Sequence, residues 1–274
     1  MGNHQSVTMN LDSIFVEKIS GHGRNLVNLK KAKSMGVVDD YALDIAEAVK
    51  DSDLVVLCTP VSKIVPLIET MLPHLKVGVV ITDVGSVKGS LVHEADKLMR
   101  EGIFFVGSHP IAGGEKSGLE ASREDLYFDA KCILTPTSKT HTQALEKVGA
   151  LWESVGMDTL ILDADEHDFV FGAVSHLPHI VAYALMNTLG ALRTNQDHEV
   201  TAYSGAGLKD ITRIASGDPV MWRDICLSNQ KHSLDLIDRF QKTLGELSSL
   251  IEKNDGQALE EAFSAANKYR MKVI

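Results

Sequence analysis

Short apolar runs that alternate with amphipathic segments are the feature that most constrains the fold of this chain. The apolar runs cover residues 54–58, 79–82, 104–106, 132–134 and 159–162, and turn residues follow the first three of them. Continuous apolar runs that end in turn residues are typical of parallel strands buried on both faces. Helix-like spacing fills residues 62–74, 86–100 and 140–155. This alternation predicts βαβ units and therefore an α/β fold with a doubly wound, Rossmann-like parallel sheet.

The strand signals stop after Asp163, and the rest of the sequence has helical patterns. Residues 167–192 predict one helix or two helices joined at Pro178, and residues 219–253 predict one long helix. Apolar positions in the long helix repeat at spacings of three and four, as in a coiled-coil seam. These positions are Ile237, Phe240, Leu244, Leu247 and Ile251. The seam could pack within its own domain or join two copies of the chain. We therefore predict an α/β domain over residues 1–162 and an all-α domain over residues 163–274.

The composition narrows the class of protein. A length of 274 residues suggests roughly two domains at about 150 residues each. A net charge of -10 argues against binding to nucleic acid or to an anionic membrane surface. The three cysteines are far apart, so neither a disulfide framework nor a metal site is expected. The apolar stretch 169–192 contains polar residues and a proline, which fits a buried helix of a soluble protein better than a membrane span. With no signal peptide visible, we expect a cytoplasmic protein.

Three predicted strands end in residues that could meet a ligand. In an open α/β sheet, ligands bind beyond the carboxyl ends of the strands. Ser86 and His109 follow neighbouring strands and could reach one substrate hydroxyl, whose proton a histidine can accept near neutral pH. The alternative is that each side chain makes only a loop hydrogen bond. The residues that we predict to bind a cofactor at this edge are Cys58, Thr59, Pro60, Asp83, Gly85 and Ser86.

Five longer motifs stand in one order along the chain. They are Thr82–Lys88 (TDVGSVK), Gly107–Gly118 (GSHPIAGGEKSG), Ser175–His179 (SHLPH), Gly207–Ala215 (GLKDITRIA) and Asp218–Asp224 (DPVMWRD). Together they resemble the prephenate/arogenate dehydrogenase family of tyrosine biosynthesis. The resemblance runs from about Gly21 to the last helix. It implies an NAD(P)-dependent oxidoreductase that forms a homodimer through an all-α C-terminal domain. A different two-domain hydroxyacid dehydrogenase is the alternative enzyme, and only the resemblance argues against it.

The family reaction is an oxidative decarboxylation. It converts prephenate to 4-hydroxyphenylpyruvate, or arogenate to tyrosine, with hydride transfer to a nicotinamide. The resemblance places His109 as the acceptor of the ring hydroxyl's proton, with Ser86 beside it. It places Arg213 on a substrate carboxylate, which suits the planar fork of donors in arginine. Further residues that it implies in the substrate pocket are His179, His176, Glu115, Lys209 and Asp210.

Structural roles remain open for several of these residues. Arg213 could form an ion pair on a helix surface, His176 and His179 could be core histidines, and Asp210 could be an ordinary helix charge. We expect Trp222 to be a packing anchor. Because the net charge of -10 repels a dianionic substrate, we expect Arg213 and the histidines to create a local positive potential.

The first strand of the family's nucleotide site, with its GxGxxG turn, has no counterpart in the sequence. The glycines of that turn let the backbone approach a pyrophosphate at a helix N-terminus. Residues 15–20 match the second strand, and Arg24 after it is placed to meet a 2′-phosphate, which favours NADP over NAD; Arg24 could equally be a solvated turn residue.

The first strand is central in such a sheet, so its absence would leave two buried strand edges unpaired. Three explanations compete. In the first, which we favour, the start lies inside a longer reading frame or the chain is truncated. Residues 1–12 could instead fill the gap. The third is a catalytically silent, dimeric binding protein of the same fold that has lost its nucleotide site.

Overall fold

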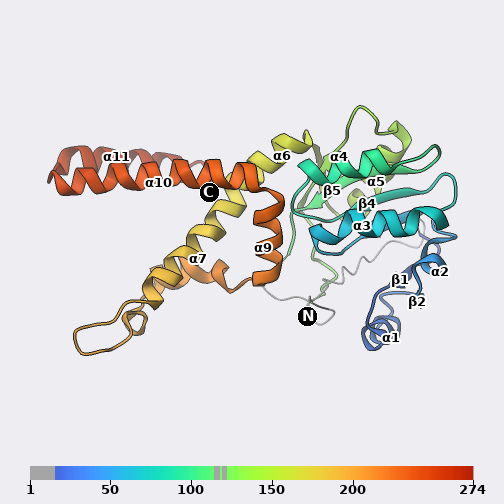
Figure 1. The fold of residues 1–274 in the computed structure, drawn as a ribbon, viewed down its shortest axis with the longest axis horizontal. Coiled ribbons are helices and arrows are strands. Elements are labelled where there is room, and N and C mark those ends of the chain that lie inside the picture. The colour runs from blue at the N-terminus through green and yellow to red at the C-terminus, as the bar shows by residue number, and fades with distance from the viewer. Residues whose placement is uncertain (1–15, 114–117, 119–121, 274) are drawn as a thin grey trace. The chain divides into compact units, whose positions relative to one another are not determined.

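The structure is a computed structural model that describes residues 16–113, 118 and 122–273. Its main sheet has five strands in the order β3-β4-β5-β6-β7. Figure 1 shows its strands β4 and β5 beside the helices that cover them. They are β3 (Leu54–Leu57), β4 (Val80–Asp83), β5 (Phe104–Pro110), β6 (Lys131–Thr135) and β7 (Asp158–Ile161). All five predicted strands are confirmed. The prediction of a wholly parallel sheet is wrong for β6, which runs antiparallel to β5 with His109 opposite Ile133. An apolar run records that a strand is buried on both faces and carries no information about its direction.

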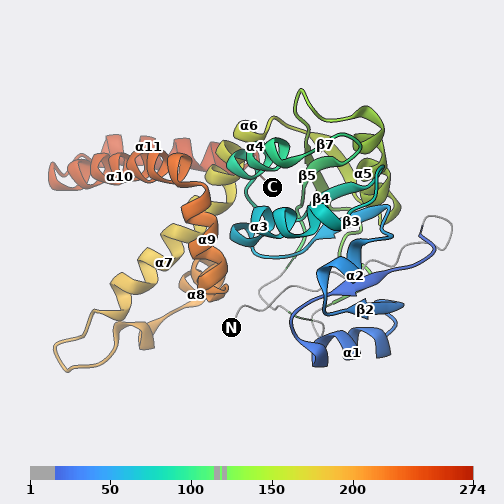
Figure 2. The same ribbon diagram turned by 45° about the vertical axis from the view of Figure 1, so that its right-hand side comes forward.

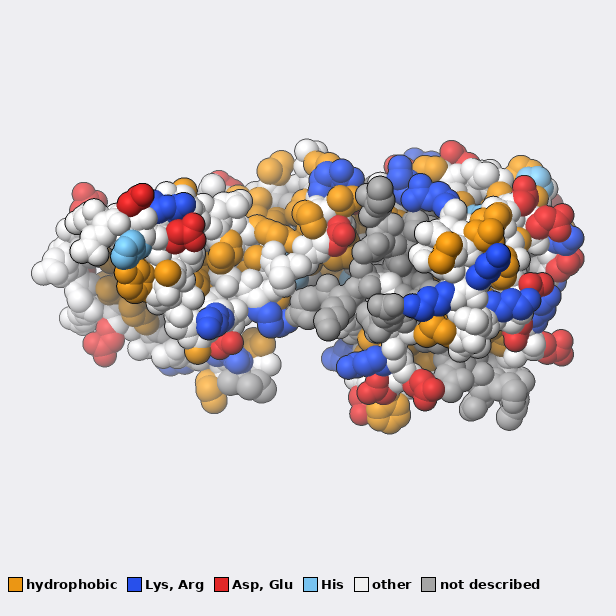
Figure 3. All heavy atoms as spheres, turned by 90° about the horizontal axis from the view of Figure 1, so that it is seen from below, with side chains coloured by type: hydrophobic (Ala, Val, Ile, Leu, Met, Phe, Trp, Pro, Cys, Tyr) orange, Lys and Arg blue, Asp and Glu red, His pale blue; other side chains and the backbone are white. Residues whose placement is uncertain are grey.

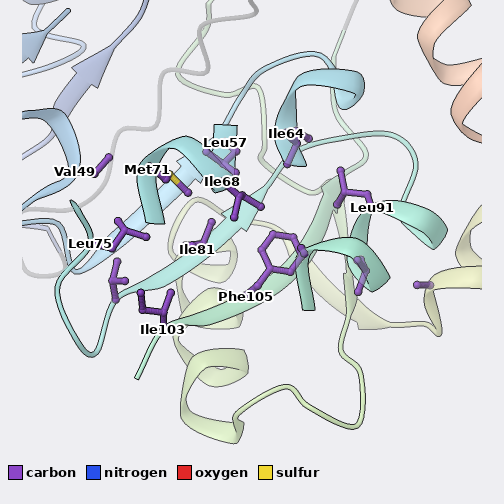
Figure 4. Packing of buried hydrophobic residues seen from close by; sticks show 14 residues of the cluster. Val49, Leu57, Ile64, Ile68, Met71, Leu75, Ile81, Leu91, Ile103 and Phe105 are labelled. Carbon is purple, nitrogen blue, oxygen red and sulfur yellow. The ribbon is translucent and has the colours of Figure 1, made fainter. Parts of the chain in front are cut away.

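The predicted helices are confirmed as α3 (Val61–Met71), α4 (Gly89–Leu98) and α5 (Thr142–Ser154), and a single 3₁₀ turn (Leu72–His74) follows α3. Helices α3 and α4 cover one face of the sheet, where Ile81 and Phe105 are buried against them (Figure 4). Helix α5 covers the other face, over Val80 and Val106. Successive strand residues point to opposite faces, so both faces of β4 and β5 are apolar and buried. The sheet therefore lies between two helical layers, with its carboxyl edge left for ligands.

A separate two-stranded parallel sheet precedes the main one. It pairs β1 (Ser20–His22) with β2 (Asp40–Ala42), and α1 (Leu26–Ser34) and α2 (Ile45–Val49) accompany it (Figure 2). The strand predicted over residues 15–20 begins only at Ser20 and continues to His22, because the described residues 16–19 are not in a strand. Within the described residues, β3 pairs only with β4, and no strand links β3 to β1. Residues 1–12, which the sequence analysis names as one candidate for the missing first strand, lie outside the described residues.

Helices make up the rest of the chain. Helix α6 (Ala164–Phe171) begins at Asp163, whose carboxylate accepts hydrogen bonds from the backbone N–H groups of Asp165 and Glu166. A π-helical turn (Gly172–His176) joins it to α7 (Leu177–Gly190), so the predicted junction lies just before Pro178. The remaining elements are a 3₁₀ turn (Val200–Tyr203), α8 (Ala206–Thr212), a second 3₁₀ turn (Arg213–Ser216), α9 (Pro219–Ser228), α10 (Gln230–Glu252) and α11 (Gly256–Arg270).

The prediction of one helix over residues 219–253 is wrong, because Asn229 separates α9 from α10. Its backbone leaves the helical region (φ -107°, ψ 41°), and its buried side chain donates to the backbone oxygen of Asp168 at 2.7 Å. Residues 230–274 form a second compact unit. In this unit α10 and α11 lie side by side as a helical hairpin (Figures 1 and 2).

The stretch Ala164–Gly190 is long and apolar enough to cross a membrane by length and composition. Only 22% of its most apolar window is buried by the described residues of this one chain, so these residues alone do not supply the burial that the sequence analysis predicts. Exposed apolar side chains on the helices include Val174 at 67% and Leu227 at 64% exposure. Figure 3 shows such hydrophobic side chains, drawn in orange, on the molecular surface. An exposed apolar helix of this kind needs a partner surface, either a second chain or lipid.

Candidate active site

The turn after β4 is fixed by a buried ion pair. Lys88 and Asp83 are both fully buried, and the Lys88 ammonium donates to the Asp83 carboxylate. That carboxylate also accepts from the backbone N–H groups of Gly85 at 2.8 Å and Ser108 at 3.2 Å. A Cβ atom on Gly85 would lie 2.9 Å from the Asp83 carboxylate, so the turn requires glycine there. Asp83 therefore holds the turn that carries Ser86, and its own carboxylate is buried.

His109 is the next-to-last residue of β5, and its neighbour Ser108 is bound to Asp83 at the start of this turn. The Nδ1 atom of His109 lies 2.8 Å from Nε2 of His167 on α6, and its ring packs edge-on against Phe171 with centroids 4.9 Å apart. Burial first, and then the nearby His167 and Lys88, hold the pKa of His109 well below 6.5. Within the described residues, Nε2 of His109 has no hydrogen-bond partner. The side chain is thus a neutral imidazole with one nitrogen available to a ligand.

His176, in the π-helical turn, presents a donor. Asn229 donates to its Nδ1 atom at 3.1 Å, so the ring proton lies on Nε2. This Nε2 atom is buried and makes no hydrogen bond in the described part of the chain. Burial lowers the pKa of His176 to about 4, although Asp168 and the backbone of Ser86, which lies near Nε2 but outside hydrogen-bond geometry, oppose the shift. A buried N–H group without a partner is costly, which points to a ligand oxygen as its partner.

His179 and Arg213 lie together beside Trp222. The rings of His179 and Trp222 stack with centroids 3.6 Å apart, and Nδ1 of His179 lies 2.8 Å from the backbone oxygen of Ser175. Burial lowers the pKa of His179, and the Arg213 guanidinium is close enough to add to the effect. Trp222 is buried with Val87 and Ile225, which confirms it as a packing anchor.

The histidines therefore do not supply the positive potential that the sequence led us to expect. The pKa values of His109, His176 and His179 all fall because burial disfavours the charged ring. These rings are neutral at pH 7 and offer only single donors or acceptors. In this cluster Arg213 is the group that carries the positive charge, and its side chain is exposed on the 3₁₀ turn after α8.

The remaining predicted site residues fall into three groups. Lys209 and Asp210 are exposed on α8, and Glu115 lies outside the described residues. Arg24 is exposed between β1 and Asn25, the residue that caps α1. Cys58, Thr59 and Pro60 follow β3 directly.

The residues after β3 and β4 fit a nicotinamide nucleotide at the carboxyl edge of the sheet. The Thr59 hydroxyl is buried and makes no hydrogen bond within the described residues, so it is available to a ligand. Burial raises the pKa of the Cys58 thiol to about 12, which leaves that side chain an uncharged neighbour. The stretch in which a phosphate-binding turn would stand, residues 1–15, is outside the described part. Among the described residues, no group of three or more His, Cys, Asp or Glu side chains could hold a metal ion.

The sequence missed three residues of this site: His167, Asp168 and Asn229. His167 and Asp168 are buried, and His167 contacts both His109 and Asp168. In the sequence they belong to the charged run Asp163–Asp168, which reads as a solvated helix start. Asn229 lay inside the predicted long helix. No local pattern could have found these residues, because the partners that bring them into the site are 53 to 80 residues away.

Comparison with protein families decides the assignment. The model of the prephenate dehydrogenase nucleotide-binding domain matches residues 12–160, and that of the prephenate dehydrogenase dimerization domain matches residues 163–265. The chain belongs to the prephenate dehydrogenase family. It is therefore related to NAD-dependent oxidoreductases and carries a dimerization domain, which confirms the resemblance seen in the motifs.

Individual relatives agree with this assignment. The chain is 35% identical to cyclohexadienyl dehydrogenase of Zymomonas mobilis, over 88% of this chain and 82% of that protein. It is 36% identical to prephenate dehydrogenase of Bacillus subtilis, over 87% of this chain and 64% of that protein. Among solved structures, prephenate dehydrogenase from A. aeolicus in complex with hydroxyphenyl propionate and NAD+ superposes with a TM-score of 0.89. It is 39% identical, over 96% of this chain and 91% of that one.

Proposed function

We propose that this chain catalyses the oxidative decarboxylation of prephenate to 4-hydroxyphenylpyruvate, or of arogenate to tyrosine, with NAD or NADP. One observation carries the proposal: a neutral His109 stands at the carboxyl end of β5 with Nε2 unpartnered among the described residues, in a fold of the prephenate dehydrogenase family. Such a nitrogen can accept the proton of a ring hydroxyl while that hydroxyl becomes a carbonyl.

In the proposed reaction the nicotinamide, when bound, accepts the hydride from the ring carbinol carbon. His109 takes the hydroxyl proton at Nε2, and the ring carboxylate leaves as carbon dioxide. The electrons of the broken carbon–carbon bond make the ring aromatic, and the ring oxygen, now a phenol oxygen, takes the proton back. No net proton is consumed, so the histidine needs only to hold the proton for part of the cycle.

The other groups of the site hold the substrate. We assign Arg213 to a carboxylate of the substrate, because it is the cation of the cluster and stands beside His179. We assign the buried N–H group of His176 to a substrate or cofactor oxygen. Ser86 lies on the turn beside His176 and supports His109 at the hydroxyl. Lys209, Asp210 and Glu115 would shape the entrance of the pocket.

The proposal extends to the cofactor and the domains. Residues 1–162 would bind the nucleotide through Thr59, Pro60, Cys58 and the turn at Gly85, and Arg24 would favour NADP. Residues 163–274 would bind the substrate and form a homodimer. The exposed apolar side chains Val174, in the π-helical turn, and Leu227, in α9, support a second copy as their partner, because the matched model for this region is a dimerization domain. An acidic, dimeric enzyme of this kind would work in the cytoplasm, without nucleic acid or membrane partners.

One experiment tests the proposed function. The purified chain is mixed with each of the four pairs of NAD or NADP with prephenate or arogenate, and the absorbance of reduced nicotinamide is followed. We expect turnover with at least one pair. The His109→Asn variant should turn over that pair at no more than about 1% of the parent rate, since a general base contributes about 10²–10⁴-fold. A protein that reduces no cofactor, and whose addition leaves NADH and NADPH fluorescence unchanged, would instead be the silent binding protein.

A further inference from the structure

A chain of hydrogen bonds runs from His109 into the interior of the protein. Nδ1 of His109 lies 2.8 Å from Nε2 of His167, and Nδ1 of His167 lies 2.9 Å from Oδ1 of Asp168. His167 is fully buried and Asp168 is nearly so. We propose that His167 and Asp168 are positioning residues that hold His109 in the tautomer whose basic nitrogen is Nε2. This inference rests on the proposed function, since it concerns the same proton transfer.

Asp168 holds the inner end of this row of hydrogen bonds in place, because the start of α4 binds its carboxylate. Oδ1 accepts from the backbone N–H of Lys88 at 2.7 Å, and Oδ2 accepts from that of Gly89 at 2.8 Å. Backbone N–H groups at a helix N-terminus favour a negative charge. The contact is so close that a Cβ atom on Gly89 would lie 2.8 Å from Oδ2 of Asp168. The carboxylate is therefore an acceptor only, fixed in place.

The position of the Asp168 carboxylate fixes the direction of both hydrogen bonds that join Asp168, His167 and His109. Because Asp168 accepts, the proton of His167 lies on Nδ1, and its Nε2 atom must accept. His109 must therefore donate from Nδ1, which leaves the lone pair of its ring on Nε2. A carboxylate that fixes a histidine tautomer in this way is a known element of catalytic triads, here with a second histidine inserted between carboxylate and base.

The same hydrogen bonds allow His167 to share the charge of the proton that His109 receives. When the hydroxyl O–H bond breaks and Nε2 of His109 gains the proton, the Nδ1 proton can move to Nε2 of His167. The charge then lies on the ring that contacts Asp168. Burial opposes this charge most and lowers the pKa of His167. Of the charged and titratable groups around His167, Asp168 and Asp83 favour the charge, and Lys88, His109 and His176 oppose it. Returning the proton to the product reverses the same steps.

Two variants of nearly equal size separate positioning from packing. His167→Gln keeps a hydrogen-bond acceptor near the position of Nε2, whereas His167→Leu fills the space without one. We expect His167→Leu to lower kcat by about 10- to 100-fold with little change in KM, a part of the about 10²–10⁴-fold that a general base contributes. We expect His167→Gln to retain most of the activity. Equal losses in both variants, or no loss in His167→Leu, would overturn the proposal.

A spectroscopic measurement tests the tautomer without any turnover. Nitrogen-15 NMR distinguishes a protonated ring nitrogen from a bare one, and the His109 signals are those that vanish in His109→Asn. We expect Nδ1–H in the parent protein and in His167→Gln, and a mixture of tautomers in His167→Leu. A parent protein with the proton on Nε2 refutes the inference even if His167→Leu does not fold. If no substrate is turned over, the proposed function fails, while the tautomer still decides this inference.

Discussion

Replacing Lys88 by Met tests how the turn that carries Ser86 is held. The Lys88 ammonium and the Asp83 carboxylate are both fully buried, and the ammonium also donates to the backbone oxygen of Val87 at 3.2 Å. Met fills a similar volume and removes the charge. Asp83 keeps its two backbone donors and loses its only counter-ion among the described ion pairs.

The expected cost follows from the burial of the pair. Removing one partner of a buried ion pair leaves an uncompensated charge and costs about 3–5 kcal/mol. For a chain of this size the loss corresponds to a fall in Tm of roughly 6–20 °C. The double variant Lys88→Met with Asp83→Asn removes both charges and should regain part of the stability.

The assay is urea unfolding followed by circular dichroism at one fixed protomer concentration, because dimerisation adds to apparent stability. Lys76→Met is the matched control, since Lys76 pairs with Asp53 at 2.7 Å on the surface and such pairs contribute about 0–1 kcal/mol. A Lys88→Met variant that loses no more than the Lys76→Met control would refute the reasoning. So would a double variant less stable than Lys88→Met alone.

Four further outcomes are expected. Arg213→Ala should raise KM at least tenfold while the midpoint of urea unfolding stays unchanged. The control is Arg239→Ala, because Arg239 is an exposed arginine that pairs with Asp235 within α10. An unchanged KM in Arg213→Ala would remove Arg213 from the site. His109→Asn should lower kcat by about 10²–10⁴-fold, and near-normal turnover would exclude a role as base. The pKa of His176 in the folded protein is lowered from 6.5 to about 4, so its contribution to stability is present above pH 6.5 and is lost as pH falls toward 4. His176→Gln should therefore flatten the dependence of the free energy of unfolding on pH in that range, and an equally steep dependence would contradict the assignment. Val174→Asp should shift the protein toward monomer in analytical ultracentrifugation if a second copy covers this face, whereas a dimer of unchanged affinity would place the interface elsewhere.

The sequence predicted the sheet and its covering helices well, because both are recorded in local patterns. Each apolar run of the first half became a strand, and the helical spacing of residues 62–74 became α3. The same patterns could not predict the direction of a strand or the position at which a long helix is interrupted. The antiparallel entry of β6 depends on the path of the chain before it, and the break at Asn229 depends on a hydrogen bond to Asp168.

In the candidate site, too, some features could be recognised along the sequence and others depend on neighbours in space. The motifs brought Ser86, His109, His176 and Arg213 to attention, because residues after strand ends and in family motifs can be recognised along the chain. The charge states of the histidines were expected wrongly, since a pKa depends on burial and on neighbours that no motif shows.

By itself, the sequence determined the α/β architecture and the family and pointed to His109 as the candidate base, since periodicity and motifs are properties of neighbouring residues. Only the tertiary structure decided which groups surround that histidine. It turned the Asp83 carboxylate inward to Lys88 and joined His109 to His167 and Asp168, across 58 residues of chain. The physical reason is that hydrogen bonds and burial act over a few ångströms of space, whatever the separation along the chain.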